Sequence, residues 1–204
     1  AAYYLIMAWV EPKGYSKEEV NLAGDILIDS GSSTDQKEYA HHILDHWRAI
    51  HSYPMHVFKM RLKSTARQVD TTALTVQRLK RVPAILRKLT RDYPARTKRI
   101  TLFEMQDIGG CRSVLPDIGS ASKLFEKYYV KGELKHKKIK INNYVTNPKK
   151  DGYRGYHIIY AYRSDKNKKK YNGLLIEIQI RSKLQHLWAT AVETVDFFTK
   201  QAIK

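Results

Sequence analysis

The sequence predicts an α+β fold in which an N-terminal helical segment, residues 1–69, precedes a mixed-sheet domain, residues 70–204. Two observations predict it. Apolar residues recur at helical spacing up to about residue 69, and beyond it short β-type runs alternate with helical ones. With 43% hydrophobic and 11% aromatic residues, the 204-residue chain can bury a core, which argues against a disordered basic tail.

Three helices are predicted in the N-terminal segment. Ser16 and Glu19 have the capping-box spacing at which a helix starts. A second helix begins near Thr34 and continues until Tyr53-Pro54 interrupts it, and a third covers residues 55–69.

Strands and further helices alternate from Leu74 onward. The predicted strands cover residues 75–77, 110–115, 156–162 and 174–180, and the predicted helices cover residues 82–89, 118–129 and 184 onward. In the last strand the isoleucines share one face. The polar residues between them share the other face, and these are Glu177, Gln179 and Arg181. A period of two is typical of a half-buried strand.

Positive charge dominates the second part of the chain. The sequence has 37 Lys and Arg against 20 Asp and Glu, a net charge of +17. Residues 1–50 contain four basic and eight acidic residues, a net charge of −4, so residues 51–204 carry +21. Basic clusters occupy residues 78–99, 131–150 and 166–170, and the third is expected to be a solvated hairpin loop. This excess indicates a polyanionic partner, either a nucleotide or a nucleic acid.

Cysteine content and hydropathy indicate where in the cell the protein is expected. Cys111 is the single cysteine, which excludes a disulfide framework and a multi-cysteine metal site and fits a reducing, cytoplasmic location. No apolar run approaches the roughly 20 residues of a membrane span, so no membrane partner is expected.

Two carboxylates beyond residue 50 have unusual neighbours. Asp107 precedes a Gly-Gly pair that leads into a predicted strand, and Glu177 lies between two isoleucines in mid-strand. Taken singly, Asp107 could be a turn residue and Glu177 part of an exposed strand face. On neighbouring strands the two would suit Mg²⁺, which takes one or two carboxylates together with phosphate oxygens and water. Such an ion neutralises charge during transfer of a phosphoryl-type group.

The segment from Tyr144 to His157 contains glycine, basic and aromatic residues. It lacks the Walker A pattern of glycines followed by Lys and Ser/Thr. Its Lys149 and Arg154 could contact phosphates, and Tyr153 offers a flat face on which a base could stack. The alternative is a turn whose tyrosine packs inward.

Three ordered motifs resemble the synthetase domain of the RelA/SpoT family. They are Met-Gln-Asp-Ile-Gly-Gly-Cys-Arg at 105–112, the Tyr-Val-x-x-Pro-Lys-x-x-Gly-Tyr-Arg-x-x-His loop at 144–157, and Glu-Ile-Gln-Ile-Arg at 177–181. The resemblance covers roughly residues 70–195. It implies a nucleotidyltransferase-like mixed sheet flanked by helices, and an ATP-dependent pyrophosphokinase that transfers the β,γ-pyrophosphate of ATP to a ribose 3′-hydroxyl.

The resemblance also assigns roles by position. It implies that Asp107 binds Mg²⁺ and that Glu177 helps to hold the metal and acts as general base towards the acceptor hydroxyl. The implied ATP contacts are Arg78, Lys80 and Lys88, with Arg112 beside them. The implied acceptor contacts are Tyr153, which stacks on the base, and Lys149 and His157. Gln179 and Arg181 share the strand face of Glu177 and are therefore expected to line the same pocket.

Three positions depart from the family pattern. Ala84 stands where a serine is common in the ATP segment, Asn142-Asn143 replaces a frequent Lys-Asp, and Asp151 replaces an asparagine that often helps to read guanine. These departures leave the phosphate chemistry intact but weaken the expectation that the acceptor is the family's usual guanine nucleotide.

Two further stretches, residues 47–54 and 184–194, resemble the single-domain toxic small alarmone synthetases of toxin–antitoxin and phage-defence modules. That resemblance, with the +21 segment, favours tRNA as acceptor at its 3′ CCA end, and hence a toxin that inhibits translation. The alternatives are an alarmone synthetase acting on GDP, GTP or an adenosine nucleotide, and a catalytically inactive RNA-binding domain. A toxin would need an antitoxin protein or an autoinhibitory segment C-terminal to Lys204.

Trp188 is expected to pack in the core, and His186 is expected either in the core or in the site.

Overall fold

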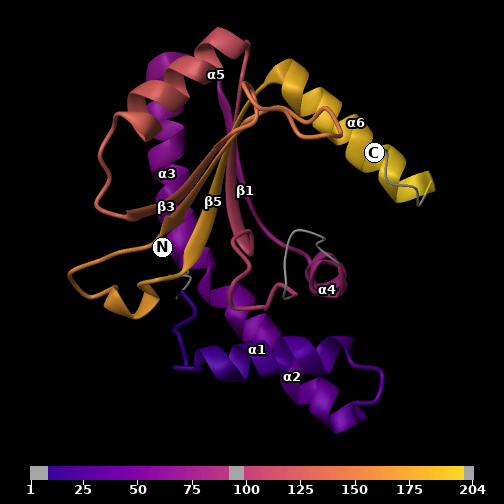
Figure 1. Cartoon of the computed structure of the whole chain (residues 1–204). Coiled ribbons are helices and arrows are strands. Elements are labelled where there is room, and N and C mark those ends of the chain that lie inside the picture. The colour runs from indigo at the N-terminus through magenta and orange to yellow at the C-terminus, as the bar shows by residue number, and fades with distance from the viewer. Residues whose placement is uncertain (1–8, 92–98, 200–204) are drawn as a thin grey trace, which may run out of the picture.

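The computed structural model describes residues 9–91 and 99–199 (Figure 1). The predictions for Arg96 and Lys98, in the first basic cluster, lie outside the described residues. Within the described ranges, no helix is both long enough and apolar enough to cross a membrane.

Three helices form the N-terminal segment, as predicted. They are α1 (Lys17–Ile28), α2 (Thr34–Ile50) and α3 (Ser52–Val69). Capping boxes start α1 at Ser16 and α2 at Ser33, because each serine side chain accepts a backbone N–H three residues later. The predicted break at Tyr53-Pro54 is wrong by a few residues, since α2 ends at Ile50. Pro54 lies in the first turn of α3, where its missing N–H removes no helical hydrogen bond.

Five strands form one mixed sheet. They are β1 (Leu74–Leu79), β2 (Gly109–Leu115), β3 (Lys137–Asn143), β4 (Tyr156–Ala161) and β5 (Leu175–Ser182), arranged in the order β1-β2-β5-β4-β3. The central pair, β2 and β5, is parallel, and the other neighbours are antiparallel. The connection from β4 to β5 is a hairpin that contains the lysine-rich loop, as predicted, with a short 3₁₀ turn at Lys169–Tyr171.

Helices cover the two faces of the sheet differently. In Figure 1, α3 and α5 (Ile118–Phe125) lie on one side, while α4 (Val82–Thr90) and α6 (Lys183–Thr199) lie on the other. The α3 and α5 side is a closed core in which all three β5 isoleucines are buried. The opposite side, which carries Glu177, is called the site face below.

Two elements differ from the sequence prediction. The helix predicted over 118–129 is α-helical only to Phe125 and continues as a π-helix over Glu126–Val130. Strand β3 was not predicted at all, because five of its seven residues are Lys or Asn, residue types that are uncommon in strands. It is an edge strand, and exposed lysines are a common means of keeping such an edge from pairing with another chain.

Candidate active site

Strand register aligns the predicted site residues in rows across the site face. Arg78 on β1 is level with Gly110 on β2, which is level with Glu177 on β5. The next row begins with Arg112 on β2 and continues through Gln179 on β5 and His157 on β4. Residues that are up to 100 positions apart in the sequence therefore lie side by side because side chains alternate between faces with a period of two.

These rows form the floor of a cavity of about 630 Å³ on the site face. All but one of the predicted site residues line this cavity. Those that line it are Arg78, Lys80, Lys88, Asp107, Arg112, Lys149, Tyr153, His157, Glu177, Gln179 and Arg181. The exception is Arg154, which is exposed and donates a hydrogen bond to the Val145 carbonyl at 3.3 Å. Arg154 directly follows Tyr153, but the structure does not bring its side chain to the cavity.

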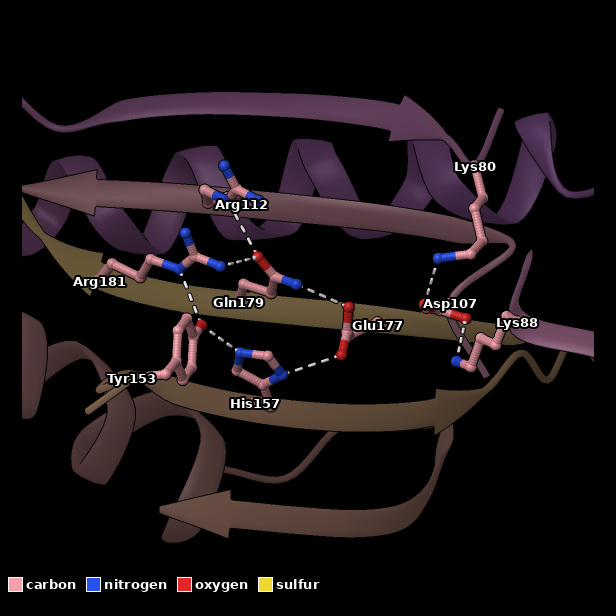
Figure 2. Close-up of polar contacts among 9 residues, drawn as sticks. All are labelled: Lys80, Lys88, Asp107, Arg112, Tyr153, His157, Glu177, Gln179 and Arg181. Atoms are coloured by element: carbon pink, nitrogen blue, oxygen red, sulfur yellow. Dashed lines mark hydrogen bonds and ion pairs between the residues drawn. The ribbon is translucent and has the colours of Figure 1, made fainter. Parts of the chain in front are cut away.

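Asp107 is held between two lysines (Figure 2). Lys80 Nζ lies 2.9 Å from Asp107 Oδ2, and Lys88 Nζ lies 2.7 Å from Asp107 Oδ1. Burial opposes ionisation of this carboxyl, but the two ammonium groups outweigh burial and lower the Asp107 pKa below its ordinary value. Lys80 follows β1, Lys88 comes from α4, and Asp107 lies just before β2, so three elements meet at this carboxylate.

Glu177 is held on both of its oxygens. Its Oε1 accepts from His157 Nδ1 at 2.9 Å, and its Oε2 accepts from Gln179 Nε2 at 2.7 Å (Figure 2). Burial raises the pKa of this carboxyl, but the hydrogen bonds from His157 and Gln179 favour the ionised form, and the pKa lies below its ordinary value. The carboxylate is therefore ionised at neutral pH and fixed in orientation.

The hydrogen bonds continue from His157 to Tyr153 and Arg181. An ionised Glu177 can only accept, so His157 Nδ1 donates to it, and in the neutral ring Nε2 then accepts from the Tyr153 hydroxyl. The same hydroxyl accepts from Arg181 Nε at 2.9 Å. Burial raises the pKa of Tyr153 to about 12, so it stays protonated and can fill this donor role.

Arginine side chains complete the network through Gln179. Gln179 Oε1 accepts from Arg112 Nε at 2.9 Å and from Arg181 at 3.0 Å. Arg181 is buried, and its Nη1 has no hydrogen-bond partner among the described residues. A buried cationic donor of this kind is normally satisfied by water or a ligand.

Lys149 lies against the acceptor-side aromatics. Its Nζ is 4.7 Å from the ring centroid of Tyr144 and 4.8 Å from that of Tyr153, while the Arg181 guanidinium is also 4.8 Å from the Tyr153 centroid. Burial lowers the pKa of Lys149, although nearby carboxylates partly oppose the shift. The Tyr153 ring, expected to stack on a base, is thus engaged by two cations in this structure.

Sequence reasoning missed several residues that line the cavity. Lys140 and Asn142 reach it because they occupy the site-face positions of the unpredicted strand β3. Trp188 and Glu193 reach it from α6. The prediction that Trp188 packs in the core is wrong, because its side chain is 53% exposed at the cavity wall, while His186 is half-buried. The helical repeat of α6 could have indicated a shared face for residues 188, 189, 192 and 193.

The donor set fits a magnesium ion that is completed by substrate. Asp107 and Glu177 line one cavity and are close enough for Asp107 to raise the pKa of Glu177, although His157 has the larger influence. Among residues 9–91 and 99–199, no group of three or more His, Cys, Asp or Glu side chains is arranged to hold a metal. Two carboxylates without a full protein cage match the preference of Mg²⁺ for one or two carboxylates plus phosphate and water.

A cation-lined cleft with two carboxylates on a mixed sheet is a site for phosphate-group chemistry. A family model described as the region found in RelA / SpoT proteins matches residues 77–199, and the chain belongs to this family. The predicted RelA/SpoT resemblance is thereby confirmed at the level of the family.

Known relatives agree with this assignment. The chain is 29% identical over 123 residues to the GTP pyrophosphokinase YjbM of Bacillus subtilis (strain 168), a match that covers 59% of this chain and 54% of that protein. The chain thus spans about half the length of this curated relative.

Solved structures confirm the predicted mixed sheet flanked by helices. The structure of small alarmone synthetase 1 from Bacillus subtilis is 23% identical with a TM-score of 0.57, covering 74% of this chain and 80% of that chain. Small alarmone synthetase 2 from the same organism is 18% identical with a TM-score of 0.62, covering 77% and 82%. At these identities the likeness shows the fold alone, and the resemblance to the toxic subgroup stays a prediction.

Proposed function

We propose that this chain is an ATP-dependent pyrophosphokinase that transfers the β,γ-pyrophosphate of ATP to the ribose 3′-hydroxyl of a guanine nucleotide. The observation that carries the proposal is the ionised Glu177, fixed on both oxygens, in the same cation-lined cavity as Asp107. This arrangement supplies a base for an acceptor hydroxyl beside a place for a metal-bound polyphosphate.

On the donor side, Lys80, Lys88 and Arg78 bind the ATP phosphates. Mg²⁺, held by Asp107 and Glu177, supplies neutralisation of the phosphate charge when it is bound. The two lysines exchange their ion pairs with Asp107 for contacts with phosphate oxygens. Each charge is therefore paired both before and after ATP binds. This limits the free energy needed to separate the two lysines from Asp107.

On the acceptor side, Glu177 takes the proton of the 3′-hydroxyl while the 3′-oxygen forms a bond with the β-phosphorus of ATP. The bond between that phosphorus and the oxygen bridging to the α-phosphate breaks, and AMP leaves. His157 and Gln179 keep the carboxylate oriented throughout, and Tyr153 holds His157 in the tautomer that donates to Glu177.

Three observations support a guanine nucleotide as acceptor. The curated relative is named a GTP pyrophosphokinase, and small alarmone synthetase 1 from Bacillus subtilis has been solved bound to its product pppGpp. Asp151 lines the cavity, and a carboxylate can accept two hydrogen bonds from the N1–H and N2–H groups of guanine, which adenine lacks in that arrangement.

A tRNA 3′ end is the second candidate. The observation that favours it is the continuity of positive charge from the cavity to the sheet edge, because Lys140 lines the cavity while Lys137 and Lys138 on the same strand are exposed. Such a surface suits a polynucleotide. The same lysines also protect an edge strand, so their presence has an explanation that requires no RNA.

A labelled-donor assay tests the proposal. The protein is incubated with γ-labelled ATP and Mg²⁺, together with GDP, GTP, an adenosine nucleotide or deacylated tRNA, each in a separate reaction. We expect label in the guanine nucleotide product. Label in tRNA alone would replace the first candidate with the second, and transfer to no acceptor would contradict the pyrophosphokinase proposal.

Toxicity and its control belong to the same proposal in its tRNA form. A translation-inhibiting toxin would stop growth when expressed alone, and co-expression of its antitoxin protein or fusion to an autoinhibitory segment would restore growth. Toxicity that persists in Glu177→Ala would instead indicate the catalytically inactive RNA-binding alternative.

A further inference from the structure

Trp188 is a large aromatic side chain that the fold leaves exposed inside the cavity. Helix α6 begins directly after β5, and the residues of its inward face, Trp188, Ala189, Val192 and Glu193, all line the cavity. Ala189 is buried against the sheet and Val192 is half-buried, whereas 53% of Trp188 remains exposed. An indole ring of this size exposed in a cleft represents apolar area that a ligand can cover.

The indole lies against the loop that carries the acceptor-side residues. A Cβ atom added to Gly152 would lie 3.7 Å from Trp188 Cζ2 and 3.8 Å from Nε1. Gly152 has φ +77°, a conformation that favours glycine, and the indole ring lies beside it at a distance that is ordinary van der Waals contact for an added Cβ. Tyr153 is the next residue, so Trp188 lies close to the predicted acceptor subsite.

The two aromatic rings differ in what already contacts them. Tyr153 has Lys149 and Arg181 over its ring, and its hydroxyl is hydrogen-bonded to His157 and Arg181. No cation is recorded over the Trp188 ring within the described part of the chain. The exposed indole is therefore an aromatic surface that a base can reach without displacing a cation.

We propose that Trp188 is a specificity-determining residue that stacks on the base of the acceptor nucleotide. This inference rests on the proposed function and adds a residue on α6 to an acceptor subsite otherwise formed by the loop and β4. The indole provides affinity for a base, and the Lys149 and Arg181 cations contact the acceptor's phosphates. ATP binds through the β1, α4 and β2 cations, so its affinity does not depend on Trp188.

Steady-state kinetics with three variants test the proposal. In Trp188→Leu we expect the KM for GDP to rise about 5- to 150-fold, the range that loss of one base–aromatic stack represents, with the KM for ATP unchanged. Trp188→Phe, which keeps a ring, should recover most of the loss. Leu187→Ala is the matched control, because Leu187 is 64% exposed on the same helix and does not line the cavity.

A binding measurement separates this inference from the proposed function. GDP should quench indole fluorescence in the native chain, and the quenching should disappear in Trp188→Phe, since Trp9 and Trp47 do not line the cavity. The stacking proposal is overturned if GDP quenches both proteins equally or neither, or if Trp188→Leu raises the KM for ATP as much as that for GDP. Absence of pyrophosphate transfer in the native chain would overturn the proposed function while leaving the quenching result interpretable.

Discussion

Lys88→Gln is predicted to move metal affinity and ATP affinity in opposite directions. In the ligand-free structure Lys88 Nζ lies 2.7 Å from Asp107 Oδ1 and competes with a cation for that carboxylate. Removing the ammonium group should strengthen binding of a divalent cation in the absence of nucleotide. The same substitution removes a phosphate contact, so ATP should bind more weakly.

The magnitude follows from the charge separation. Two unit charges 2.7 Å apart attract by about 1.5 kcal/mol in bulk water and by roughly 6 kcal/mol at an effective dielectric constant near 20. The side chains of Lys88 and Asp107 are each 24% exposed, and desolvation offsets part of the Coulomb attraction, so the net strength of the pair is nearer the aqueous figure. Cation affinity should therefore rise by about tenfold. Loss of one charged hydrogen bond to phosphate, about 1.5–3 kcal/mol, should weaken ATP binding by about tenfold or more.

Mn²⁺ is a suitable probe, because its bound and free forms are distinguished by electron paramagnetic resonance. Titration of the nucleotide-free protein gives the metal affinity, and calorimetry with α,β-methylene ATP gives the nucleotide affinity. Lys123→Gln on α5 is the control, since Lys123 is exposed and does not line the cavity. Weaker binding of both ligands, or Mn²⁺ affinity equal to that of the native chain, would refute the reasoning.

Three further predictions concern catalysis and stability. Glu177→Gln keeps the shape of the side chain and removes the base, so kcat should fall by about 10²- to 10⁴-fold. A loss below tenfold in quench-flow assays contradicts the base role. Gly24→Ala should lower Tm in thermal unfolding without changing KM, because the added Cβ would lie 2.9 Å from Leu102 Cβ. Overpacking destabilises by about 1–3 kcal/mol, which exceeds the helix-propensity gain of about 1 kcal/mol. An unchanged or higher Tm would contradict this prediction. The lowered Asp107 pKa means that its stabilisation is complete above its ordinary pKa of 3.8 and is lost as the pH falls through the lower folded value. Asp107→Asn should therefore lower Tm at pH 7 and reduce the acid dependence of Tm, and equal pH profiles for both proteins would count against the lysine–aspartate cluster.

Local sequence signals were sufficient where the physics is local. The Ser16 capping box, the alternation in β5 and the lysine-rich β4–β5 hairpin depend on neighbours within a few residues, and the structure agrees with all three. The composition of strand β3 does not favour a strand, because Lys and Asn dominate it, and the strand forms by hydrogen bonding to β4 across a long loop.

Side-chain direction was the least predictable feature of the site. Arg154 is adjacent to Tyr153 and shares its motif, but only Tyr153 reaches the cavity, while Arg154 donates to the Val145 carbonyl. Trp188 was expected to be buried because tryptophan usually is, and no local pattern states whether a helix face packs on a sheet or borders a cleft.

The sequence by itself determined the residue types, their order and the family, since the three motifs that carry Asp107, Tyr153 and Glu177 can be read without any coordinates. Only the tertiary structure decided which of these groups are paired with one another. Asp107 is neutralised by one lysine that follows β1 and one on α4, and Glu177 is fixed by His157 from β4. Such pairings depend on strand register and helix placement between distant segments, which sequence spacing alone does not define.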